Sequence, residues 1–146
     1  MEARSLERGV TLLDVLVTLG IAAVIAASAA PRVFDLLGGL ELRAGAMRVS
    51  SAFVRARLAA LSEARTWVVR TAGDHTIEIG PLDEEATRED LPGLVRFARA
   101  TSGGEVRFAP SGWAENATFT VARGDRERAV TVNQRGRVTL REEVGP

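Results

Sequence analysis

A long apolar segment near the N-terminus constrains what this chain can fold into. Residues 10–30 read VTLLDVLVTLGIAAVIAASAA and carry a single charged side chain, that of Asp14. As an α-helix, these 21 residues would extend about 31 Å, close to the thickness of the hydrocarbon core of a bilayer. We therefore expect this segment to be a membrane span, a secretory signal or a buried helix.

An ordinary signal peptide is one of these alternatives. Residues 1–9 contain two arginines, an apolar region follows, and residues 27–29 (Ala-Ser-Ala) look like a cleavage site. However, Glu2 and Glu7 cancel the positive charge of the first nine residues. Asp14 also lies within the apolar region, where a carboxylate costs about 2.5–3.5 kcal/mol at the centre of a span and less near its end. Both features argue against a plain signal peptide.

Cleavage of the chain between Gly9 and Val10 would explain why an acidic residue stands at position 14. The new amine would then start the helix, and Asp14 would be its fifth residue, near the positive end of the helix dipole. Its carboxylate would be able to pair with the amine of its own chain or of a neighbour. The alternative is that Asp14 is a poorly tolerated polar residue at the membrane edge.

The residues around this cut form a motif. Arg8-Gly9 precedes Val-Thr-Leu-Leu-Asp-Val-Leu, and Pro31 stands at the 22nd position counted from Val10. This pattern resembles the signal of type IV pilins and type II secretion pseudopilins. The resemblance implies that a prepilin peptidase cuts after Gly9 and methylates Val10, and that Asp14 is required for assembly. The chain departs from the family in having Val10 instead of Phe or Met, and Asp14 instead of the longer Glu.

Residues 31–65 predict an amphipathic continuation of the helix. We expect Pro31 to kink the helix because it lacks an N–H group, and the glycines at 38 and 39 to form a second weak point. A helical period then resumes and runs to about Ala64, with Met47 in the core. The stripe that we expect to face a sheet consists of Leu40, Ala44, Met47, Ser51, Val54, Leu58 and Leu61.

Beyond Arg65 the apolar period changes from 3.6 to 2, which predicts strands. They are expected at 66–71, 75–79, 94–98, 105–109, 117–123, 129–133 and 137–141, and the acidic segment 80–92 is expected to be a solvated loop. The alternating apolar residues expected to be buried are Ile77, Ile79, Val95, Phe97, Val106, Phe108, Phe119, Val121, Val130, Val132, Val138 and Leu140. A sheet with one apolar face needs a cover, and the helix is the available one.

The C-terminal half carries a second, looser motif. Residues 108–112 read Phe-Ala-Pro-Ser-Gly and precede two strands, Asn133 and a Gly-Arg-Val element at 136–138. This arrangement resembles the GspH/FimT-type pilin domain, found in H-type pseudopilins and in FimU/FimT-type minor pilins. The resemblance implies an α+β pilin fold, in which a long N-terminal helix packs on an antiparallel sheet. The expected parts are a leader (1–9), a membrane and assembly helix (10–30), its amphipathic continuation (31–65) and a globular sheet domain (66–146).

The composition offers little catalytic or metal-binding chemistry. The 146 residues include no cysteine, which excludes disulfides, thiolate metal sites and a cysteine nucleophile, and His75 is the one histidine. No nucleophile motif accompanies His75, and the acidic residues at 83–90 lack the alternating ligands and glycine of a calcium loop. We therefore expect no enzymatic activity, no cofactor and no metal.

The basic residues are all arginines, 19 in number, and 19 acidic residues balance them. Arg137 and Arg141 share a side of the last predicted strand and Arg135 precedes it, so together they could contact DNA phosphates. Some FimT-like minor pilins bind DNA through a Gly-Arg-x-Arg element, whose second arginine is replaced by Thr139 here. Zero net charge argues against general affinity for DNA, and pairing with nearby glutamates is the alternative role.

The function expected from the resemblance is assembly. A minor pilin would join other minor and major pilins in a priming and tip complex for type IV pilus biogenesis, with Asp14 setting the register against a neighbouring amine. The alternatives are an H-type minor pseudopilin of a type II secretion system and a DNA-binding uptake pilin. The other expected partners are prepilin peptidase, an inner-membrane assembly platform and inner-membrane lipid. The C-terminal domain would face the periplasm, and the assembled subunit would lie at the pilus tip or base.

Overall fold

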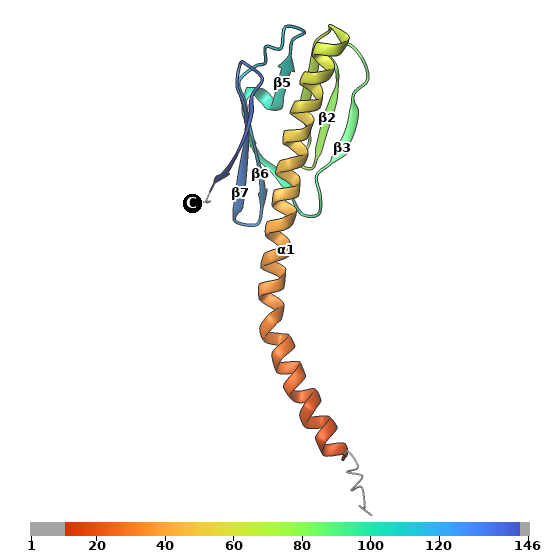
Figure 1. Cartoon of the computed structure of the whole chain (residues 1–146), viewed down its shortest axis with the longest axis vertical. Helices are drawn as coiled ribbons and strands as arrows, with labels where there is room; N and C mark the ends of the chain where they lie inside the picture. Colours follow the sequence, from red (N-terminus) through yellow and green to blue (C-terminus); the bar gives the residue numbers. More distant parts are fainter. Residues whose placement is uncertain (1–10, 144–146) are drawn as a thin grey trace, which may run out of the picture. The chain divides into compact units, whose positions relative to one another are not determined.

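The structure, a computed structural model, describes residues 11–143 (Figure 1). The expected cleavage and methylation site at Gly9 and Val10 lies outside the described residues. The chain divides into two compact units, Met1–Leu37 and Gly38–Pro146. Helix α1 (Leu12–Glu63) contributes residues to both units, and all eight strands belong to the second.

Helix α1 continues through residue 31, so Pro31 does not end it, and a kink at Pro31 stays a prediction. The helix ends where Ala64 adopts a left-handed conformation, with φ of 53°, a common way to terminate an α-helix. Gly38 leaves room for the guanidinium of Arg123, whose Nε donates to Glu41 at 2.7 Å. The glycine that reads as a weak point therefore accommodates a side chain from the sheets.

The buried face of α1 is the opposite of the one expected. Its buried residues are Leu42, Ala46, Val49, Ala52, Phe53, Ala56 and Ala60. The expectation that the stripe from Leu40 to Leu61 faces a sheet is wrong, and so is the placement of Met47 in the core, since Met47 is 50% exposed. The reason is steric: a β-carbon at Gly45 would lie 2.7 Å from Val95 Cγ1, so the segment before β4 approaches this face closely and a small residue is required there.

The strands form two antiparallel sheets instead of the single expected one. The first has the order β3-β2-β1-β5 and the second β4-β6-β7-β8. Their bounds are β1 (Trp67–Ala72), β2 (Thr76–Pro81), β3 (Thr87–Asp90), β4 (Arg96–Ala100), β5 (Glu105–Phe108), β6 (Ala117–Arg123), β7 (Arg126–Val132) and β8 (Val138–Glu143), with a short 3₁₀ turn η1 (Ser102–Gly104) before β5. Figure 1 shows both sheets beside the second part of α1.

Strand β3 lies within the segment expected to be a loop. It pairs with β2, placing Glu89 opposite Ile77 and Arg88 opposite Glu78. Its sequence, Thr-Arg-Glu-Asp, is polar throughout and has no apolar alternation. It forms a strand because it completes the hydrogen bonds of β2 at the edge of the sheet, where charged side chains remain in water.

The hydrophobic core lies entirely within the second unit. Phe53 of α1 is at its centre, with ring centroids 5.1 Å from Phe119 and 6.0 Å from Phe108. The strand residues expected to be buried are buried or packed against the core, with one exception. Leu140 is 37% exposed, because β8 is an edge strand of its sheet.

Candidate functional site

The first part of α1 exposes an apolar surface. Among the described residues, α1 is the one helix that is long and apolar enough to cross a membrane, and its most apolar window has a mean hydropathy of 2.2, with none of it buried. Leu12, Leu16 and Val24 are each more than half exposed. A continuous apolar surface of this kind is covered by lipid or by other protein.

Asp14 lies in the first turn of α1 and forms a capping box with Thr11. The backbone N–H and the hydroxyl of Thr11 both donate to Asp14 Oδ2, at 3.1 and 2.8 Å, and the Asp14 N–H donates to Thr11 Oγ1 at 3.2 Å. This reciprocal pattern satisfies backbone donors that would otherwise lack a partner. The Thr-x-x-Asp spacing is present in the sequence, but the sequence-based expectation paired Asp14 with an amine, of its own chain or of a neighbour, and not with Thr11.

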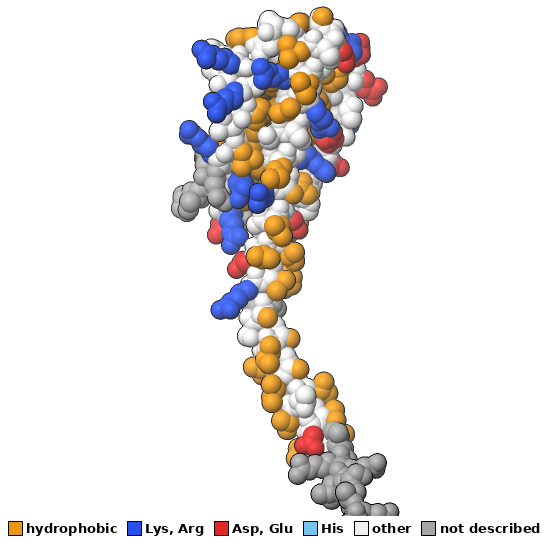
Figure 2. All heavy atoms as spheres, viewed as in Figure 1, with side chains coloured by type: hydrophobic (Ala, Val, Ile, Leu, Met, Phe, Trp, Pro, Cys, Tyr) orange, Lys and Arg blue, Asp and Glu red, His pale blue; other side chains and the backbone are white. Residues whose placement is uncertain are grey.

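The second part of α1 also presents an apolar stripe to solvent. We call it the outer α1 stripe, and it consists of Leu40, Ala44, Met47, Ser51, Val54, Leu58 and Leu61, all exposed. Leu58 is 60% exposed and Leu40 55%. Figure 2 shows apolar side chains along this helix with basic side chains on either side of them. This surface is the one that the sequence had placed in the core.

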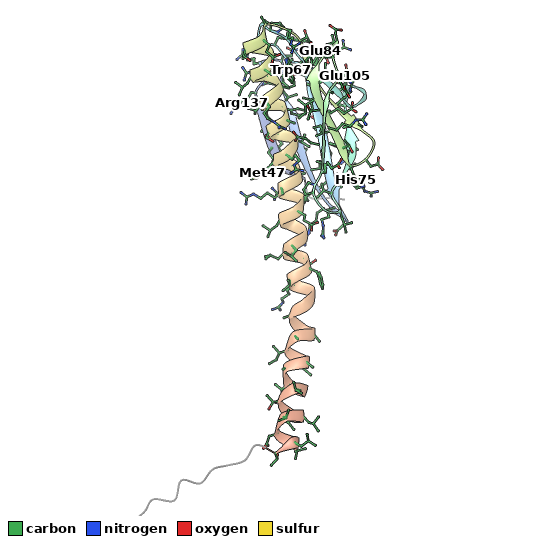
Figure 3. All side chains as sticks on the ribbon, turned by 90° about the vertical axis from the view of Figure 1, so that its right-hand side faces the viewer. Met47, Trp67, His75, Glu84, Glu105 and Arg137 are labelled. Carbon is green, nitrogen blue, oxygen red and sulfur yellow. The ribbon has the colours of Figure 1, made fainter. Side chains whose placement is uncertain are left out.

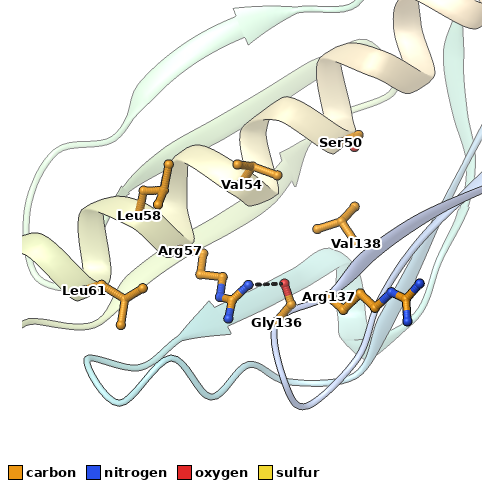
Figure 4. A pocket seen from close by; sticks show the side chains of 8 residues that line it. All are labelled: Ser50, Val54, Arg57, Leu58, Leu61, Gly136, Arg137 and Val138. Atoms are coloured by element: carbon orange, nitrogen blue, oxygen red, sulfur yellow. Dashed lines mark hydrogen bonds between the residues drawn. The ribbon is translucent and has the colours of Figure 1, made fainter.

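A groove of about 520 Å³ runs between the outer α1 stripe and the turn that joins β7 to β8 (Figure 4). It is lined by Ser50, Val54, Arg57, Leu58, Leu61, Gly136, Arg137 and Val138. Arg57 is half-buried; its Nη1 donates to the carbonyl oxygen of Gly136 at 3.2 Å, whereas its Nε is buried without a hydrogen-bond partner. The groove is thus mainly apolar, with guanidinium groups at its edge.

The β7–β8 turn is built around Asn133. The Oδ1 atom of Asn133 accepts the N–H groups of Arg135 at 3.1 Å and Arg137 at 3.0 Å, and Gly136 adopts a φ of 69°. Arg135, Arg137 and Arg141 are all exposed, as expected, and Figure 3 shows Arg137 on the opposite side of the molecule from His75. Only Arg137 of the three lines the groove.

Most other arginines of the globular unit follow the alternative role, pairing with carboxylates. Arg107 bonds to Glu105 at 2.9 Å, and Glu78 accepts from Arg88 at 2.7 Å and Arg70 at 2.8 Å. The hydrogen bonds from Arg88 and Arg70 hold the pKa of Glu78 below its usual value. These pairs distribute charge over the sheets without creating a reactive group.

His75 is a structural residue of the β1–β2 turn. Its Nδ1 donates to the carbonyl oxygen of Val95 at 2.8 Å, which ties the turn to the segment before β4. No nucleophile contacts it in the described part of the chain. Within residues 11–143, no group of three or more His, Asp or Glu side chains is placed to hold a metal ion.

No protein-family model matches the sequence, and neither does any curated protein. Solved structures do match. The type IV minor pilin FimU of Pseudomonas aeruginosa aligns with a TM-score of 0.60 at 20% identity, over 69% of this chain and 88% of FimU. A second crystal form of FimU gives 0.58 at 20% identity, over 68% of this chain and 92% of FimU.

A secretion protein matches as well. The minor pseudopilin EpsH from the type 2 secretion system of Vibrio cholerae aligns with a TM-score of 0.55 at 14% identity, over 70% of this chain and 97% of EpsH. These likenesses confirm the expected fold class, a long N-terminal helix packed on antiparallel sheets. The chain therefore has the pilin fold of FimU and EpsH.

Proposed function

We propose that this protein is a minor pilin that is anchored in the inner membrane through the first part of α1 and assembles with other pilins into a priming and tip complex for type IV pilus biogenesis. The observation that carries the proposal is the exposed apolar surface of α1, joined in one helix to a globular unit with the fold of FimU. Such a surface needs lipid before assembly and neighbouring apolar helices after it.

Asp14 is the proposed assembly residue within the apolar segment. Both hydrogen bonds from Thr11 use Oδ2, and no described residue bonds to Oδ1. The second oxygen is therefore free to accept from the N-terminal amine of a neighbouring subunit. A carboxylate placed in an apolar environment favours such a charged partner strongly, which would fix the axial register between subunits.

The processing step is the first test. The proposal includes cleavage after Gly9 by prepilin peptidase and methylation of Val10. Mass spectrometry of the N-terminus, on protein isolated from its native membrane, is expected to show a mature start at Val10 carrying one methyl group. A start at Ala30 would contradict the proposal and would favour a secreted domain released by signal peptidase.

The role of Asp14 is the second test. We expect Asp14→Ala to abolish incorporation into the filament fraction while the globular unit stays folded, because Asp14 lies outside the core. Asp83→Ala is the matched control, since Asp83 is an exposed acid of the globular unit. Normal incorporation of the Asp14 variant would show that the carboxylate is incidental.

An H-type minor pseudopilin of a type II secretion system is the second candidate function, favoured by the likeness to EpsH. Both candidates use the same helix surface and the same processing. Deletion of the gene distinguishes them: loss of surface pili with normal secretion is expected for the minor pilin. Loss of exoprotein secretion with normal piliation would favour the pseudopilin.

A further inference from the structure

The groove beside α1 has apolar walls on both sides. Val54, Leu58 and Leu61 form its α1 wall and Val138 its β8 wall, and the three α1 residues are between 44% and 60% exposed. Its volume of about 520 Å³ is enough to receive several apolar side chains. Apolar residues gathered in this way beside a helix match the manner in which helices bind in grooves.

The charge at the two edges of the outer α1 stripe is unequal. On one edge, Arg55 forms a bidentate pair with Glu89 at 2.7 and 2.8 Å. On the other edge, Arg43 and Arg57 are two heptads apart on α1, and Arg137 lies across the groove. None of these three arginines has a carboxylate partner among the side chains that the structure describes. At the groove itself, Arg57 and Arg137 are therefore not neutralised by any carboxylate that the structure describes.

Arg57 is held in position for a charged ligand. Its Nη1 bonds to the carbonyl oxygen of Gly136, a neutral acceptor, and a β-carbon at residue 136 would lie 2.6 Å from its Nε. The turn thus packs against the guanidinium without neutralising it. A half-buried guanidinium with restricted motion binds a carboxylate with less loss of entropy than a free surface arginine does.

Together these features indicate which kind of protein segment binds in the groove. We propose that the groove binds a helix of a different pilin-type subunit, one that carries an Asp or Glu among apolar side chains, and this inference rests on the proposed assembly function. The apolar walls contact the apolar side chains, and Arg57 and Arg137 contact the carboxylate. A second copy of this chain that docked through the same face would bring the same arginines together, which is unfavourable. DNA would leave Leu58 and Val138 without an apolar partner.

Site-specific photo-crosslinking tests this proposal on the full chain in the cells that make it. A benzoylphenylalanine in place of Leu58 is activated by light, and the crosslinked peptide is identified by mass spectrometry. We expect a helix of another pilin-type subunit with an acidic residue within one turn of the crosslinked position. Arg137→Glu is expected to reduce the crosslink about tenfold or more, because like charges then meet.

Matched variants keep the test independent of folding. Arg57→Gln removes the charge and is expected to reduce the crosslink in the same direction, whereas Arg96→Glu, an exposed charge reversal on β4 away from the groove, is expected to leave it unchanged. Replacing the partner's acidic residue by Arg should restore the crosslink to Arg137→Glu. A crosslink to a second copy of this chain, to DNA or to a segment without an acid would overturn the inference, as would an undiminished crosslink in Arg137→Glu.

The same cells separate this inference from the proposed function. The chain with unmodified Leu58 and the crosslinkable chain are both assayed for incorporation into filaments. If the chain is incorporated normally but crosslinks to a second copy of itself, to DNA or to a segment without an acid, the proposed occupant of the groove is wrong and the assembly function is unaffected. Absence of the unmodified chain from filaments and from secretion complexes overturns both.

Discussion

Nη1 of Arg57 on α1 donates to the carbonyl oxygen of Gly136 in the β7–β8 turn, at 3.2 Å. The same turn passes so close to the guanidinium that a β-carbon at residue 136 would lie 2.6 Å from Nε. The backbone at residue 136 has a φ of 69°, a conformation that glycine adopts without steric cost. The absence of a side chain at one residue therefore allows the turn to dock onto α1 and form one wall of the groove.

We predict that Gly136→Ala destabilises the protein more than Gly124→Ala does. Both glycines have positive φ, 69° and 62°, and each alanine would cost about 1–2 kcal/mol for the left-handed conformation. At residue 124 nothing lies within 4 Å of the added β-carbon, so that cost stands alone. At residue 136 the overlap with Arg57 adds about 1–3 kcal/mol.

Urea denaturation of the detergent-solubilised chain measures this difference. Tryptophan fluorescence reports on the globular unit, because Trp67 and Trp113 both belong to it. Equal losses of unfolding free energy in the two variants would contradict the close packing of Arg57 on the turn.

The second prediction concerns which side of α1 is packed in the core. Phe53→Ala removes a side chain with no exposed surface from contact with Phe108 and Phe119, and is expected to cost about 3–5 kcal/mol. Leu58→Gln replaces a residue that is 60% exposed by another good helix former, and is expected to change the unfolding free energy by less than about 0.5 kcal/mol. A larger loss of unfolding free energy in Leu58→Gln than in Phe53→Ala would mean that the outer α1 stripe is packed in the core.

Sequence reasoning located the strands well because their alternation depends on residue type alone. Phe119 and Val121 are both buried, as is Thr120 between them, and β6 has the predicted bounds. The same reasoning chose the wrong face of α1. Hydrophobicity favours Leu58 and Met47 over Ala56 and Ala60, whereas packing against two close sheets required the small side chains.

Two features depended on tertiary contacts and could not be read locally. Strand β3 is polar throughout and forms only because β2 offers it backbone partners. The groove exists because Gly136 and Arg57, 79 residues apart, come into contact. By contrast, the capping box of Thr11 and Asp14 is a local pattern that the sequence did contain.

The ion pairs of Glu78 predict an acid-sensitive contribution to stability. The hydrogen bonds from Arg88, then Arg70, lower the pKa of Glu78 in the folded state. A carboxylate whose pKa is lowered in the folded state stabilises the protein at neutral pH. This contribution is lost as the pH falls through the folded-state pKa, which for Glu78 lies below the ordinary value of 4.5. Between pH 5 and about 3, the Tm is therefore expected to fall more steeply in the parent protein than in Glu78→Gln.

Thermal denaturation across this pH range checks the Glu78 prediction. Glu85→Gln is the control, because Glu85 is exposed and no ion pair to it is present among the described residues. Its pH profile should match that of the parent. Parallel profiles for the parent protein and Glu78→Gln would mean that the contacts with Arg88 and Arg70 contribute nothing to acid stability.

The capping box gives a final prediction, at the start of α1. Thr11→Val keeps the shape of the side chain and removes the hydroxyl that accepts the Asp14 N–H at 3.2 Å and donates to Asp14 Oδ2 at 2.8 Å. Loss of an N-cap costs about 1 kcal/mol, so the amide hydrogen of Asp14 should exchange about fivefold faster in detergent micelles. Thr18→Val is the control, because the Thr18 hydroxyl donates to the Asp14 carbonyl at 2.6 Å and serves no backbone N–H of the first turn. Equal exchange of the Asp14 amide in both variants would show that the Thr11 hydroxyl does not cap the helix.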